Sequence, residues 1–189
     1  NEWVQDVSYP TNMLYCAALR AAASILGRLE LYKKADRIRG QIIDQSFDGE
    51  FFRDHAVRMA DGQLEVKADR SAICQHEAIL FDIIDPDAPE YSVLKNAVLH
   101  NFGIGGDMSA LPPDFVPLDL FIGFAVRVEV LMKLGLYNQN LNEIKVVYGG
   151  MAEKTGTLWE HRSGHASLNH GFGSFVACEI LECLRRLRK

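Results

Sequence analysis

Apolar residues recur every three or four positions through most of the chain, whereas the strict alternation of a half-buried strand is scarce. This spacing predicts a mainly helical, all-α protein. Glycine, proline and Asp-Pro steps divide the pattern into about seven helices. The predicted helices cover residues 11–26, 31–45, 70–84, 90–102, 114–135 and 138–148, with Gly149 and Gly150 ending the sixth, and a last one that starts at Asn169.

One stretch interrupts the helical spacing. Residues 48–66, DGEFFRDHAVRMADGQLEV, contain turn signals of the Asp-Gly type between short runs of mixed polarity. Such a pattern is typical of an irregular connection that holds a short β-ribbon. We therefore expect a small β-ribbon between the second and third helices.

The links between the helices are mostly short, which predicts antiparallel αα-hairpins in one domain, residues 1–189. Part of a closed (α/α) toroid is favoured over a solenoid, because no strict repeat is present. In such an arrangement the first, third, fifth and seventh helices share a direction, so their N-terminal ends lie on one face. Polar residues near these ends are Asn12, Tyr15, Gln75, His76, Asp114, Asp119, Asn169 and His170, of which the two aspartates are expected to be helix caps.

Composition supports an ordinary globular protein, with 48% hydrophobic and 24% charged residues. The net charge of −5 and the lack of a dense Lys/Arg run argue against nucleic acid or an anionic membrane as a partner. No metal or cofactor is implied. Four cysteines lie on apolar helical patterns without a Cys-x-x-Cys pair, so buried thiols are expected at Cys16, Cys74, Cys178 and Cys183.

Candidate chemistry is concentrated in residues 156–176, GTLWEHRSGHASLNHGFGSFV. A sugar site uses an aromatic ring to stack on a pyranose, amide and imidazole groups to bind hydroxyls, and carboxylates for acid–base work. This segment holds all three kinds of side chain. The candidate catalytic residue is Glu160, and the candidate substrate-binding residues are Trp159, Arg162, Asn169 and His170, with Asn12 and Tyr15 from the shared face of the helices.

The run WEHRSGHASLNHGFGS resembles the C-terminal signature of bacterial α-L-rhamnosidases, in which a Trp-Glu pair precedes a Ser-Leu/Phe-Asn-His run and a helix start. The first helix, introduced by YPTNMLY, agrees with this resemblance. It implies a toroid of six hairpins that cleaves rhamnosides with inversion. Glu160 then corresponds to the general base, Trp159 and His170 line the rhamnose subsite, and Asn169 shapes the turn that presents His170.

Two features depart from the family. Only RSGHASL separates the Trp-Glu and Asn-His pairs, where relatives commonly have a longer excursion. The family's general acid lies in a Gln-Arg-Asp-Glu type motif, and no such string occurs in the chain. The nearest string, CQHEAIL, contains Glu77, which is not a convincing substitute.

The helix count leads to the same expectation. About seven helices fall short of the twelve in six hairpins, so the chain is expected to be the C-terminal portion of a larger catalytic domain. The remaining half of that domain is the expected partner, and the chain alone is expected to be inactive. An open flank would also favour self-association.

Two other functions stay open. The chain could be a helical module that binds sugar or protein without cleavage, or a toroid glycosidase acting on fucose or glucose. The first residues carry no signal peptide, but they read as the middle of a domain, so the compartment stays open between bacterial cytoplasm, periplasm and secretion.

Overall fold

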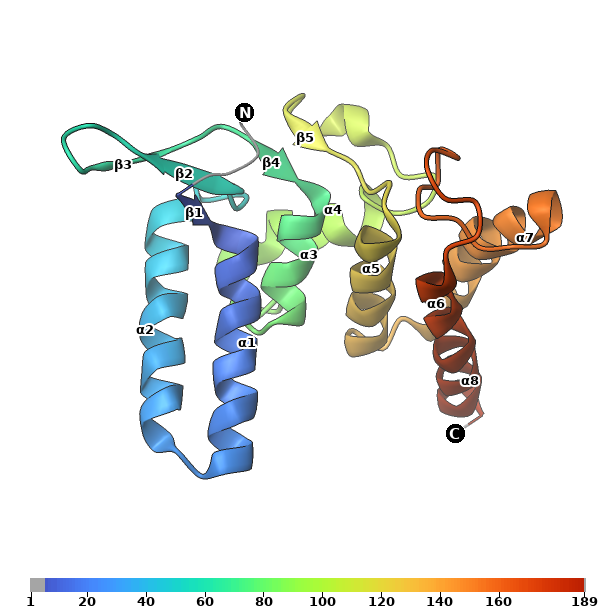
Figure 1. Cartoon of the computed structure of the whole chain (residues 1–189), viewed down its shortest axis with the longest axis horizontal. Helices are drawn as coiled ribbons and strands as arrows, with labels where there is room; N and C mark the ends of the chain where they lie inside the picture. The colour runs from blue at the N-terminus through green and yellow to red at the C-terminus, as the bar shows by residue number, and fades with distance from the viewer. Residues whose placement is uncertain (1–5, 189) are drawn as a thin grey trace.

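The computed structural model describes residues 6–188, which form a row of αα-hairpins (Figure 1). Helices α1, α3, α5 and α8 contact one another in that order, and α2, α4 and α6 pack against them. This arrangement confirms the predicted class. The helices are α1 (Tyr9–Leu26), α2 (Leu29–Ser46), α3 (Ala72–Leu80), α4 (Ser92–His100), α5 (Phe121–Lys133), α6 (Tyr137–Ile144), α7 (Gly150–Thr155) and α8 (Val176–Leu187).

The helices of the inner row, α1, α3, α5 and α8, all begin at one face of the molecule, the upper face in Figure 1. The short strands lie at this face too. Strands β1, β2 and β3 form an antiparallel sheet in that order, and β2 and β3 confirm the predicted ribbon. The strands are β1 (Val7–Ser8), β2 (His55–Arg58), β3 (Leu64–Val66) and the parallel pair β4 (Arg70–Ser71) and β5 (Phe115–Val116).

The parallel pair of strands explains why two helices start later than predicted. Because Arg70 and Ser71 pair with β5, α3 begins only at Ala72, where the Ser71 hydroxyl accepts a hydrogen bond from Cys74 N at 3.2 Å. Helix α3 also ends early, at Leu80, since Asp82 adopts a positive φ of 55°. Helix α5 begins at Phe121 rather than near residues 114–117, because those residues belong to β5 and the chain that follows it.

The two glycines at 149 and 150 do not end the sixth helix, contrary to the sequence prediction. Helix α6 continues through a π-helical turn, Lys145–Gly149, into α7. The end comes at Gly156, whose φ of 73° is the left-handed conformation that closes a helix. Counted in this way, residues 6–188 hold seven helices, as predicted.

The last helix also starts later than predicted, because Asn169 and His170 precede a 3₁₀ turn, Gly171–Phe175, that leads into α8. Two further 3₁₀ turns lie before α4 and β5, at Pro89–Tyr91 and Met108–Ala110. The candidate residues from Trp159 to His170 are therefore all on a loop, whereas Asn12 and Tyr15 lie on α1. Loops of this kind place functional side chains on a rigid scaffold.

The apolar core divides into two clusters. The larger lies among α1 to α4 and includes Val126 and Val130 of α5. The smaller joins α5, α6, α7 and α8 and includes Trp159 of the segment 156–176. Cys16, Cys74 and Cys183 are buried, as predicted. The prediction is wrong for Cys178, which is exposed because it lies on the outward side of α8.

A buried arginine joins the hairpins at their centre. Arg127 of α5 is 1% exposed, and its guanidinium pairs with both carboxylate oxygens of Glu143 on α6. It also donates to Val98 O at 2.7 Å and to His76 Nε2 at 3.0 Å. Burial, and then the Arg127 charge, lower the pKa of His76 to about 3, so this imidazole accepts while neutral. One residue thus fastens α3, α4, α5 and α6 together.

Candidate functional site

Glu160 lies in the loop 156–176, which crosses the N-terminal ends of α5 and α8 on the upper right in Figure 1. Its backbone N–H donates to Ser167 O at 2.9 Å, and its carbonyl accepts from Phe121 N at 2.7 Å. The half-buried carboxylate accepts from Ser167 N through Oε2 at 3.3 Å. Oε1 accepts no hydrogen bond from residues 6–188 and can take one from water or from a substrate.

Asp119 anchors this loop rather than capping α5. Its backbone carbonyl accepts from Arg162 N at 2.9 Å. Its carboxylate accepts from Ser163 N at 3.0 Å, from the Ser163 hydroxyl at 2.9 Å and from His161 Nδ1 at 3.0 Å. Burial raises the pKa of Asp119, but these hydrogen bonds outweigh it and hold the pKa below its ordinary value. Ser163 donates to the aspartate and not to His161, so the three residues are not arranged as a nucleophilic triad.

Trp159 packs as a core side chain beneath the loop. It is 8% exposed, lies in the smaller core cluster, and donates its indole N–H to Thr155 Oγ1 at 2.7 Å. Lys154 places its ammonium group 5.5 Å from the ring centroid. The sequence predicted that a sugar stacks on this indole, but almost none of the ring face is exposed to receive one. Trp159 instead fixes the position of Glu160, the next residue.

His170, Asn169 and Arg162 lie in the same loop as Glu160. His170 is half-buried, its backbone N–H donates to Leu158 O at 2.7 Å, and its Nε2 is buried without a hydrogen-bond partner in residues 6–188. Asn169 and Arg162 are exposed. The backbone N–H of Asn169 donates to Ser167 Oγ at 3.3 Å. That Asn169 shapes the turn presenting His170 stays a prediction.

Asn12 and Tyr15 are not brought to this loop. Both lie near the start of α1, and α3 and α5 stand between α1 and the loop (Figure 1). Asn12 donates through Nδ2 to Ser8 O at 2.7 Å, and the Tyr15 hydroxyl accepts from Lys34 at 2.7 Å. Their contacts with substrate therefore stay predictions. Such contacts would require one ligand to reach both α1 and the loop 156–176.

A second acidic group, Glu77, lies on α3. Burial, and then the neighbouring Asp54, raise the pKa of Glu77 to about 7, and its Oε2 is buried without a partner in residues 6–188. Asp54 accepts from the backbone and the hydroxyl of Ser71, both at 3.0 Å. Burial nevertheless raises the pKa of Asp54 as well. The sequence alone gives no signal for this raised pKa, because it depends on burial.

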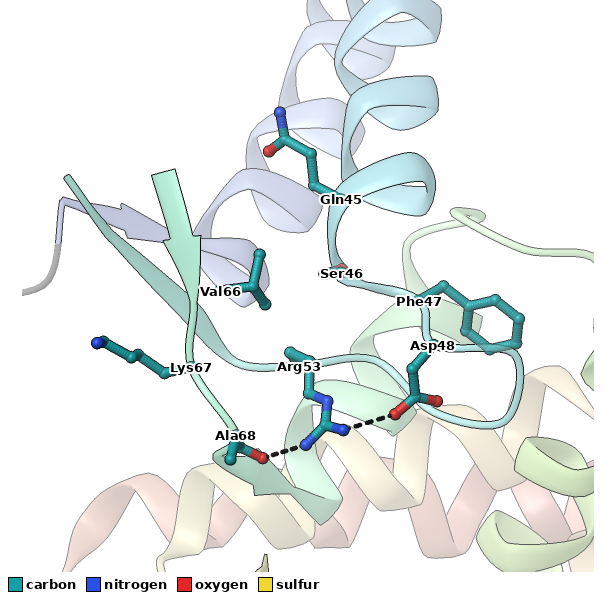
Figure 2. A pocket seen from close by; sticks show the side chains of 8 residues that line it. All are labelled: Gln45, Ser46, Phe47, Asp48, Arg53, Val66, Lys67 and Ala68. Atoms are coloured by element: carbon teal, nitrogen blue, oxygen red, sulfur yellow. Dashed lines mark hydrogen bonds and ion pairs between the residues drawn. The ribbon is translucent and has the colours of Figure 1, made fainter. Parts of the chain in front are cut away.

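A pocket of about 340 Å³ lies where α2 meets the ribbon, at the opposite end of the row from Glu160. Figure 2 shows the Arg53 guanidinium between two partners, Asp48 at 3.0 Å and the Ala68 carbonyl at 2.5 Å. Asp48 is further paired with Arg70 at 2.7 Å. Because the charges of Arg53 and Asp48 are already paired, we interpret these residues as stabilising the contact between α2 and the ribbon and not as the candidate site.

No group of three or more His, Cys, Asp or Glu side chains within residues 6–188 could hold a metal ion. None of the helices there combines the length and the apolar character needed to cross a bilayer.

Comparison with known proteins gives one structural likeness. Neither a protein-family model nor a curated protein matches the chain. The crystal structure of a GH78 family rhamnosidase of Bacillus sp. GL1 matches with a TM-score of 0.64 and 22% identity, over 86% of this chain and 17% of that one. The chain thus spans under a fifth of the length of that protein. Over this part, it has the fold of a GH78 rhamnosidase.

Proposed function

We propose that this chain is part of the catalytic domain of an inverting glycosidase, most like an α-L-rhamnosidase, that cleaves terminal rhamnose from glycans or glycosides. The observation that carries the proposal is the Glu160 carboxylate, which accepts a hydrogen bond from Ser167 N, on a backbone that Phe121 N holds at the start of α5. The likeness to a GH78 rhamnosidase supports it at the level of the fold.

In the proposed reaction Glu160 is the general base. Its Oε1 takes a proton from a water molecule as the water oxygen attacks the anomeric carbon and the glycosidic C–O bond breaks. A second carboxyl group must protonate the leaving oxygen, about 6.5–9.5 Å from the first. We assign this acid to the remaining half of the domain. Helices α1 and α8 lie toward opposite ends of the row, and each exposes a large apolar side chain, Ile25 at 82% and Leu181 at 69%. Such exposed apolar residues are suited to pack against the helices of the remaining half.

The second candidate is a module that binds sugar without cleaving it. The missing general-acid motif favours this alternative, because one carboxylate alone does not complete an inverting site. Fucose and glucose are the alternative substrates within the glycosidase class.

A panel of aryl glycosides tests the proposal. The protein at its natural length should release aryl alcohol from the α-L-rhamnoside and far less from the α-L-fucoside and α-glucoside. Residues 1–189 alone should release none, because the acid is supplied from outside them. Faster cleavage of the fucoside or glucoside would reassign the sugar, and binding without any release would favour the second candidate. Turnover by residues 1–189 would place the acid within them, with Glu77 the first carboxyl group to substitute.

A further inference from the structure

Phe172 is an exposed aromatic ring beside the catalytic loop. It lies in the 3₁₀ turn before α8, is 73% exposed, and is the most exposed aromatic side chain in residues 6–188. Leaving so large an apolar surface in water is unfavourable, because the ring gains no free energy from burial. A ring kept in that position within a candidate site is a surface that a ligand can cover.

The ring is supported from the side by two others. Phe121, the first residue of α5, stacks on Phe172 with centroids 5.8 Å apart and an angle of 13° between the rings. His170 contacts both, with centroids 4.5 Å from Phe121 and 5.3 Å from Phe172. We call these three residues the aromatic platform. It is built on the starts of two helices of the inner row, so its rings have a rigid base.

Backbone hydrogen bonds join the platform to Glu160. Phe121 N donates to the Glu160 carbonyl at 2.7 Å, and His170 N donates to Leu158 O, two residues before Glu160, at 2.7 Å. The platform also holds His170 Nε2, which is buried and has no hydrogen-bond partner within residues 6–188. This nitrogen is closed to solvent, so a group that covers the rings meets their apolar surface and not the imidazole nitrogen.

Resting on the proposed function, we propose that Phe172 is the ring on which the terminal sugar stacks, in place of the buried Trp159. The apolar C–H face of a pyranose packs well on an aromatic ring, and a 6-deoxy sugar offers a methyl group where other hexoses have a hydroxymethyl group. Phe121 and His170 then support the ring from the side. The platform thereby favours a 6-deoxyhexose over its 6-hydroxy counterpart.

The test compares Phe172 variants of the protein at its natural length. Phe172→Ala should raise KM for the aryl rhamnoside about 10-fold or more, the loss of a contact worth roughly 1.4 kcal/mol, with kcat changed far less. Phe172→Tyr should keep the wild-type KM, and Phe172→Leu should fall between, since it keeps apolar area without a ring. Leu29→Ala, at a similarly exposed apolar position (72%) at the start of α2, is the matched control and should leave KM unchanged. An unchanged KM in folded Phe172→Ala would overturn the proposal.

A binding arm separates this inference from the proposed function. L-Rhamnose titrated into wild type and Phe172→Ala is followed by NMR, independently of hydrolysis. Binding that is lost in Phe172→Ala without any hydrolysis by wild type would refute the glycosidase and keep the platform. Hydrolysis with equal binding by both would refute the platform alone. A change in oligomeric state on ultracentrifugation, with binding intact, would identify Phe172 as a protein contact and also refute it.

Discussion

Replacing Glu160 with glutamine is expected to lower kcat for aryl rhamnoside hydrolysis by about 10²–10⁴-fold, the usual contribution of a general acid or base. Glutamine has nearly the same shape, and its side-chain oxygen can still accept the hydrogen bond from Ser167 N. The loop should therefore stay folded. What the amide cannot do is take the proton from the attacking water. Initial rates of aryl alcohol release, with circular dichroism to confirm folding, provide the measurement.

Glu153 offers a matched control. It is an exposed glutamate on α7, seven residues before Glu160, and it carries no proposed part in the reaction. Glu153→Gln should keep kcat within about 2-fold of wild type, because an exposed side chain away from the site rarely matters. Equal activity of wild type and Glu160→Gln would contradict the assignment of the base, whatever the effect of Glu153→Gln.

Replacing Arg127 with methionine is expected to cost about 3–5 kcal/mol of the free energy of unfolding, as the loss of one partner of a buried ion pair does. Methionine fills much of the same space but leaves the Glu143 carboxylate buried beside α5 without its guanidinium. The Val98 carbonyl and His76 Nε2 lose their donor as well. Urea denaturation at neutral pH, followed by circular dichroism, measures the change.

Two further variants show whether the effect belongs to the buried pair. Arg127→Met combined with Glu143→Leu should recover part of the loss, because an apolar pair removes the uncompensated charge. Arg20→Met breaks the ion pair with Asp36, whose side chain is largely exposed, and should cost less than about 1 kcal/mol. If Arg127→Met were as stable as Arg20→Met, the buried network would not fasten the hairpins.

The periodicity of apolar residues was sufficient to predict the hairpins and the ribbon, because both depend on local spacing. It could not predict where α3 and α5 begin, since β4 and β5 are paired across more than 40 residues. Nor could it show that Gly149 and Gly150 stay helical. Two glycines lower helix propensity, but only a left-handed residue such as Gly156 ends the helix.

For the candidate site, the sequence identified the loop and not the exposure of its side chains. Trp159 and Phe172 are both aromatic residues in one segment, yet one is 8% and the other 73% exposed. That difference depends on the helices below the loop, which no linear pattern reveals. Phe121 and Asp119 come from 40 residues upstream, and only the fold shows that they hold the loop. From the sequence, Asp119 was predicted only to cap the fifth helix.

The stereochemistry of hydrolysis tests the central claim most directly. Proton NMR can follow the anomeric signals of rhamnose during the first minutes after the protein at its natural length meets an aryl α-L-rhamnoside. With Glu160 activating water on the face opposite the leaving group, β-L-rhamnose should appear first and the α-anomer only later, by mutarotation. Initial release of α-L-rhamnose, or no release of rhamnose at all, would contradict the proposal that Glu160 is the base of an inverting rhamnosidase.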